Sequence, residues 1–235
     1  AKGDTVSRTT SASSGAISLL SGGDASVYAY VGKGASDPQT VRVYAAKNVA
    51  VKSSGDINMA ATSRSDAVAT MTEGFKVSVA SVNKANTVTQ LYTRTEALVA
   101  DGASIEAGGA LNVSAYDNVV AKTEVNGSSV GLLVSADKKY AENDAQQRVR
   151  TDIGRATLRA GGNMSILGTA DAQMSALTNA NGGGLFDKGR LTAVTALDRQ
   201  VDVYVRSGAT LEAGTKASGA ALTVKSETGV NDNIR

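Results

Sequence analysis

Residues 102–113 read GASIEAGGALNV, and residues 155–166 read RATLRAGGNMSI. A third segment reads GATLEAG at residues 208–214 and resumes as ALTV at residues 221–224. A fourth, NVAVKSSGDINM, occupies residues 48–59. Each segment is a short alternating stretch, a glycine turn and a second alternating stretch. We interpret the four as copies of one repeat, because a repeat determines the architecture of the whole chain.

The copies recur at a nearly constant distance. Their first aliphatic anchors are Val51, Ile105, Leu158 and Leu211, which by subtraction are 54, 53 and 53 residues apart. The last copy carries an insertion, residues 215–220, which we expect to loop out on one face. Four copies in one register predict stacked structural units that each contact only their neighbours.

Within each copy the apolar residues flank a polar one, as in Leu111-Asn112-Val113. A period of two places Leu111 and Val113 on one face of a strand and Asn112 on the other. A helix is disfavoured, because each interior glycine costs about 1 kcal/mol relative to alanine. We expect the paired glycines to turn the chain with backbone angles closed to other residues. The pattern predicts an all-β parallel β-helix, or β-solenoid.

Alternation also precedes the motifs, at residues 41–44 and 201–205. In the third copy, residues 148–151 alternate in the opposite phase relative to Leu158. A one-residue bulge at Gly154 would turn Val149 inward again. We expect about two coils in each 53-residue repeat, with the second coil formed by residues 75–79, 130–134 and 191–194.

The chain as a whole, residues 1–235, is predicted to be one continuous solenoid segment of a longer protein. Residues 1–40 match the repeat least clearly. Within them, Thr5 to Leu20 fits the tail of a preceding repeat, and Tyr28–Val31 fits another strand.

Composition limits the chemistry that the chain can perform. It is 42% hydrophobic but only 4% aromatic, which suits a thin core of small and β-branched residues. There is no Cys and no His, so disulfides, thiolate ligands and imidazole bases are excluded. The net charge is +2 without a basic run, which argues against a nucleic-acid partner. No apolar run reaches 18 residues, so membrane insertion is not expected.

At these motifs the chain resembles the long repeats of bacterial filamentous haemagglutinin-like and leukotoxin-type filamentous adhesins. The resemblance rests on residues 102–113 and 208–214 and covers roughly residues 40–235. It implies a right-handed parallel β-helical shaft, secreted through the outer membrane as part of a very large surface protein. It implies an extracellular location and flanking repeats of the same chain as neighbours. It does not identify a host or surface ligand.

Two kinds of candidate site involve carboxylates. Residues 22–24, 55–56 and 182–187 combine glycine with Asn or Asp, but the tandem nonapeptide of calcium β-rolls is missing. We interpret them as plain turns and expect neither a metal nor another cofactor. Glu106 and Glu212 share a column with Lys52 and Arg159. Alternating charge in one column is typical of a solvated ladder and not of a catalytic pair.

Two further columns could be either binding surfaces or ordinary strand positions. Tyr44 and Tyr204 match in register and would stack on a glycan if outward-facing, but Leu98 and Thr151 are expected between them. Ser104, Thr157 and Thr210 form one column, as an ice-binding or mineral-binding face would require, yet Ala50 interrupts it.

The sequence therefore favours a structural, non-enzymatic shaft with no catalytic, metal-binding or cofactor-binding residue. The alternative is a β-helix that processes polysaccharides, for which residues 137–142 and the insertion at 215–220 are the places to inspect. An ice- or surface-binding solenoid is a minor alternative. Residues 1–4 and 229–235 show no capping helix, so we expect end-to-end association, or else neighbouring coils supplied by the parent chain. Lateral self-association is a further possibility.

Overall fold

The computed structural model describes residues 2–13, 16–214 and 219–234. Its regular secondary structure is β-strand, and within the described residues no helix is long and apolar enough to cross a membrane. The strands are β1 (Lys2–Ser13), β2 (Ala16–Val31), β3 (Gln39–Ala45), β4 (Ala50–Ser53), β5 (Ile57–Glu73), β6 (Lys76–Val99), β7 (Ser104–Ala107), β8 (Leu111–Ile153), β9 (Thr157–Ala160), β10 (Met164–Gly183), β11 (Phe186–Asp187), β12 (Arg190–Val205), β13 (Thr210–Ala213) and β14 (Leu222–Ile234).

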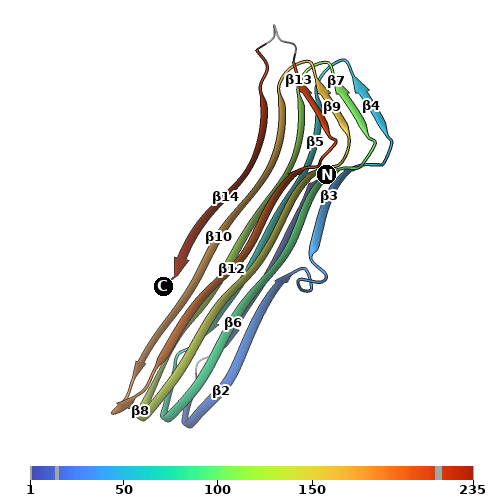
Figure 1. Cartoon of the computed structure of the whole chain (residues 1–235). Coiled ribbons are helices and arrows are strands. Elements are labelled where there is room, and N and C mark those ends of the chain that lie inside the picture. Colours follow the sequence, from blue (N-terminus) through green and yellow to red (C-terminus); the bar gives the residue numbers. More distant parts are fainter. Residues whose placement is uncertain (1, 14–15, 215–218, 235) are drawn as a thin grey trace.

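Each coil has two long faces and one short face (Figure 1). The short strand β4 leads into β5, which forms one long face, and β6 returns along the other. Strands of successive coils pair in parallel as β1-β5-β8-β10-β14, with β2 and β3 pairing β6, β6 pairing β8 and β8 pairing β12. The short strands pair separately in the order β13-β9-β7-β4. The predicted class, a parallel β-solenoid, is confirmed.

The prediction of two coils per repeat is wrong, because one coil uses the whole repeat. Ile57 pairs with Leu111, and Leu111 pairs with Met164, so adjacent levels are 54 and 53 residues apart. Alternation continues through the 17 residues of β5 and the 24 of β6, far beyond the usual strand of about 5–6 residues. Phe75, expected to begin a second coil, is 57% exposed at the turn between them.

The core lies between the two long faces. Along β5, β6, β8 and β10, buried residues alternate with more exposed ones, as the period of two requires. Apolar side chains form two clusters, one beside the short strands and one nearer the middle of the long faces. Leu111 and Val113 are buried and Asn112 is not, which confirms the predicted inward and outward positions.

The phase change in the third copy has a different cause from the one predicted. Val149 is buried, as expected. Val99 pairs with Ile153, and Ser104 pairs with Thr157. Residues 154–156 of the third copy are therefore the structural counterpart of residues 100–103 in the coil before. The connection at Gly154 is therefore one residue shorter than its counterpart, and the strand contains no inserted bulge there.

The first coil is formed by residues 2–49. The strand expected at Tyr28–Val31 is confirmed as part of β2. β2 pairs with β6 at an offset of 60 residues and β3 at an offset of 54, as Val31↔Leu91 and Gln39↔Thr93 show. Residues 32–38 therefore form a loop beside Tyr92. Gly32 and Gly34 in this loop have positive φ values of 72° and 147°, which favour glycine.

Contrary to the prediction, the paired glycines are needed mainly because there is no room for a side chain, and not because of unusual backbone angles. Gly108 and Gly161 have no φ in the left-handed region. A Cβ on Gly108 would instead overlap the carbonyl oxygen of Ser54, and one on Gly161 would overlap that of Gly108. The glycines let each turn lie directly on the turn of the coil before it.

Candidate functional site

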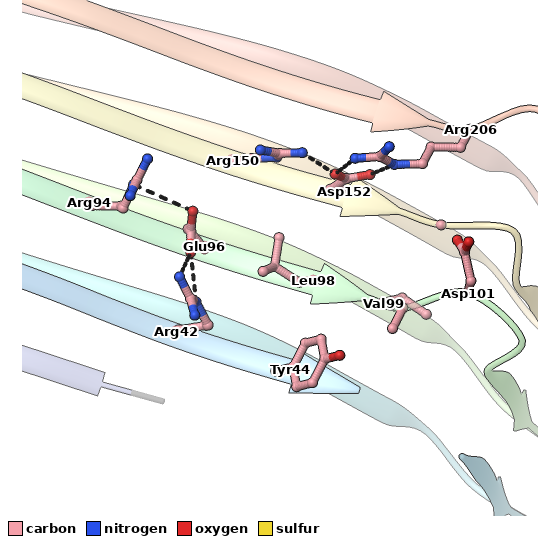
Figure 2. Close-up of a pocket in the computed structure, with 12 residues that line it drawn as sticks. Arg42, Tyr44, Arg94, Glu96, Leu98, Val99, Asp101, Arg150, Asp152 and Arg206 are labelled. Carbon is pink, nitrogen blue, oxygen red and sulfur yellow. Dashed lines mark hydrogen bonds and ion pairs between the residues drawn. The ribbon is translucent and has the colours of Figure 1, made fainter. Parts of the chain in front are cut away.

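A surface hollow lies on the outer side of β3, β6 and β8, near the short strands. It has a volume of about 450 Å³. Alternation along these strands turns every second side chain outward, and pairing aligns Arg42, Glu96, Arg150 and Asp202 in one column. Figure 2 shows Arg42, Arg94, Arg150 and Arg206 gathered around two carboxylates. We call this hollow the arginine groove.

Each carboxylate of the groove lies between two guanidinium groups. Glu96 accepts a hydrogen bond from Arg42 Nε at 2.6 Å, and Arg94 Nε lies 3.5 Å from its other oxygen. Asp152 accepts two bonds from Arg206, at 2.8 Å and 2.6 Å, and a further bond from Arg150. The Glu96 and Asp152 side chains are only 6% and 9% exposed, so the arginines form most of the accessible polar surface.

The electrostatics of the groove do not suit acid catalysis. Hydrogen bonds from Arg206 hold the pKa of Asp152 below its ordinary value. A general acid for glycosidic cleavage needs the opposite shift, so that its proton is still bound near neutral pH. Asp101, at the rim, also has a lowered pKa, because the Arg155 backbone N–H donates to it at 2.8 Å. The groove therefore presents fixed charges and donors.

The two tyrosines occupy one column, as the sequence predicts. Tyr44 and Tyr204 are 55% and 46% exposed on the outer face. Leu98 and Asp152 lie between them, so the expected position of Thr151 is wrong. The shorter connection at Gly154 shifts the sequence count by one residue. The Arg150 guanidinium lies 5.5 Å from the Tyr204 ring centre, within cation–π range.

The predicted charge ladder is confirmed on the short face. Pairing places Lys52, Glu106, Arg159 and Glu212 in one column. Lys52 lies 3.0 Å from Glu106, and Arg159 lies 3.5 Å from Glu106 and 2.7 Å from Glu212. The adjacent column, Ala50, Ser104, Thr157 and Thr210, also has the predicted register.

The glycine-rich candidates for calcium serve other contacts where the structure describes them. Asp24 lies 3.4 Å from Lys84, and Asp56 accepts a bond from the Ala110 backbone N–H at 2.7 Å. The side chain of Asp187 lies outside the described part. Among the described residues, no three Asp or Glu side chains are close enough together to share a metal ion.

Residues 137–142, chosen for inspection from the sequence, contribute to a buried polar cluster near the far turn. Asp137 and Lys139 point into the core, where they are 4% and 2% exposed. Lys139 forms an ion pair with Glu73, and Asp137 accepts a bond from Asn83 Nδ2 at 3.2 Å. Burial lowers the pKa of Lys139. The insertion is described only at residues 219 and 220.

A further buried carboxyl group was missed by sequence reasoning. Asp117 is fully buried between the long faces and accepts bonds from Thr93 Oγ1 at 2.6 Å and Gln147 Nε2 at 3.1 Å. Burial raises its pKa above the ordinary value. The signal was present, because Asp117 occupies an inward position of the alternating pattern that begins at Leu111. Only the return strand could show which groups face it.

Large apolar side chains are exposed along the narrow edge where the chain turns between the long faces. We call them the apolar strip: Leu19, Leu20, Phe75, Leu132, Leu133, Leu185 and Phe186. Their exposed fractions range from 50% to 78%. Exposed apolar surface of this kind is a common feature of contact sites.

No family model matches the chain, and no curated protein or solved structure matches it either.

Proposed function

We propose that the chain is a shaft segment of a large secreted bacterial surface adhesin, with the structural role of extending and stiffening its parent protein. The observation that carries this proposal is that the apolar core continues to both edges of the stack. Leu111 and Met164 are buried in inner coils, whereas Leu222 in the same column is 46% exposed at the edge. Further coils would cover such side chains and extend the rod.

The stacking geometry supports the same role. Each coil is hydrogen-bonded to the next along the stack, so it serves as the template for its neighbour. Polar columns on the outer faces are linked by ion pairs between successive coils. The resemblance of the repeat motifs to filamentous adhesins supplies the location, outside the cell and at the bacterial surface. Flanking repeats of the same parent chain would be the immediate neighbours.

Immunogold labelling of producing cells tests the proposed location. An antibody against this segment should label intact cells and place gold beyond the outer membrane, because a shaft holds its coils away from the cell. An antibody against a periplasmic protein, as control, should label only lysed cells. Labelling of this segment only after lysis would contradict the proposal.

The arginine groove gives the enzymatic alternative a specific test. The purified chain is incubated with acidic polysaccharides, and newly released chain ends are measured. We expect none from the wild type or from Asp152→Asn. Release by the wild type that is lost in Asp152→Asn would replace the shaft proposal by a polysaccharide-processing activity.

A further inference from the structure

Among the described residues, the outermost strands at the two ends of the stack pair on one side only. At the N-terminal edge, β2, β3 and β4 each pair with a strand on one side only. At the C-terminal edge, the same holds for β12, β13 and β14. Unpaired strand edges offer rows of backbone donors and acceptors to any strand that fits. The side chains beside those rows determine which strand that is.

Three outward columns carry a charge at both edges. They are Asp24–Lys84–Lys138–Arg190, Arg42–Glu96–Arg150–Asp202 and Lys52–Glu106–Arg159–Glu212. In every one the first and last members have opposite charge. Two columns alternate over four members, so repeating them end on end would continue the alternation. The remaining column, Asp24–Lys84–Lys138–Arg190, begins with an anion and ends with a cation.

Apolar columns are also open at both edges. Val51 is 40% exposed at the N-terminal edge, while Ile105 and Leu158 in its column are fully buried. Val224 is 46% exposed at the C-terminal edge, and its inner counterpart Ile166 is fully buried. A coil stacked in register on either edge would cover these side chains.

We propose that, where no flanking repeat covers them, the C-terminal edge of this segment binds the N-terminal edge of a second copy, head to tail and in register. This inference deepens the shaft proposal and rests on it for its biological setting. The pairs across the joint are Asp24 with Arg190, Arg42 with Asp202 and Lys52 with Glu212.

The charges set the register and direction of the joint more than its strength. Exposed ion pairs contribute little each, and salt weakens them. Like charges placed opposite one another disfavour a wrong partner strongly. Within the described columns, the head-to-tail arrangement brings no two like charges together. A head-to-head arrangement would bring together two N-terminal edges, each of which carries Arg42 and Lys52.

Paired charge reversals test the joint in the full chain. Lys52→Glu makes this column negative at both edges, and Glu212→Lys makes it positive at both edges. We expect each variant alone to associate about tenfold more weakly than the wild type in a sedimentation concentration series. An equimolar mixture should recover wild-type association, because every joint between unlike variants again pairs opposite charges.

Lys122→Glu is the matched control. It changes the net charge as Lys52→Glu does, but Lys122 lies on β8 inside the stack, is exposed and belongs to none of the three columns. We expect wild-type association from it, and circular dichroism should show all variants folded. High salt should weaken association of the wild type and reduce the difference between variants.

Three results would overturn the proposal. They are a wild-type chain that remains monomeric, association that neither reversal weakens, and a mixture that does no better than its components. Association through the apolar strip would give the second result and would strengthen with salt. None of these outcomes affects the immunogold test, so failure of the joint and failure of the shaft proposal are distinguishable.

Discussion

Asp117 lies in the core with a fully buried side chain, held by hydrogen bonds from Thr93 and Gln147. Burial raises its pKa, so the ionised carboxylate that neutral pH favours is costly in the folded chain. The buried Ser63 hydroxyl lies beside it. An amide of the same shape could keep both acceptor bonds and donate to Ser63.

We therefore expect Asp117→Asn to raise the free energy of unfolding at pH 7 by about 1–2 kcal/mol. The raised pKa means that Asp117 opposes folding as pH rises above the unfolded value of about 3.9. Below that pH the group is protonated in both states and the gain should disappear. Urea denaturation at pH 7 and pH 3.5 measures this, and a less stable variant at pH 7 would contradict it.

Leu111 and Asn112 form a matched pair on opposite sides of one strand. Leu111→Asp should cost roughly 3 kcal/mol or more, because it places a carboxylate in a thin apolar core. Asn112 donates to Asn58 Oδ1 at 2.9 Å on the outer side, so Asn112→Asp should cost about 1 kcal/mol. Thermal melting of both variants distinguishes the two positions. Equal losses would mean that the inward and outward assignment is wrong.

At the scale of the element, the glycine turns decide how closely coils can stack. Gly161 and Gly162 are neighbours in one turn but differ in surroundings. A Cβ on Gly161 would overlap the Gly108 carbonyl oxygen of the preceding coil, whereas the nearest atom to a Cβ on Gly162 is 3.4 Å away. The first position therefore excludes a side chain and the second accommodates a methyl group.

We expect Gly161→Ala to lower the free energy of unfolding by about 2–3 kcal/mol, because the turn must move away from the coil before it. Gly162→Ala should change it by about 0.5 kcal/mol or less. Chemical denaturation of both variants provides the comparison. If the two substitutions are equally tolerated, the turns stack less closely than described.

The repeat motifs could be predicted in register because each contains its own signal, aliphatic anchors around a glycine turn. The length of the coil could not. β8 runs for 43 residues from one long face to the other, and within it no Pro or Gly-Gly marks the corner, where residues 132–134 are all exposed and the alternation is interrupted. The arginine groove combines Arg42, Arg94, Arg150 and Arg206 from separate coils. The position of the groove depends on the connection at residues 154–156, which is one residue shorter than its counterpart at residues 100–103. In the sequence this difference is visible only as a change in the phase of alternation.

At the scale of the molecule, every described coil except those at the edges is paired on both sides, so among the described strands only those at the edges offer unpaired backbone to another strand. One backbone feature limits the proposed joint. β1 pairs with residues 62–73 of β5. In an in-register joint, β14 of the preceding copy would approach the same edge of β5. Lys2 and Glu227 belong to one column, as do Thr9 and Ile234, so the two strands compete over eight positions.

Removing β1 should therefore strengthen head-to-tail association. A chain that begins at residue 14 keeps the charges of both edges and exposes the β5 edge that β14 would pair. We expect its association constant to exceed that of the full chain, with the same weakening by Glu212→Lys. Sedimentation at matched concentrations gives both comparisons. Association that is unchanged or weaker would mean that β14 does not pair with β5 of the next copy. The neighbouring coils would then have to meet through the short strands and β12 alone.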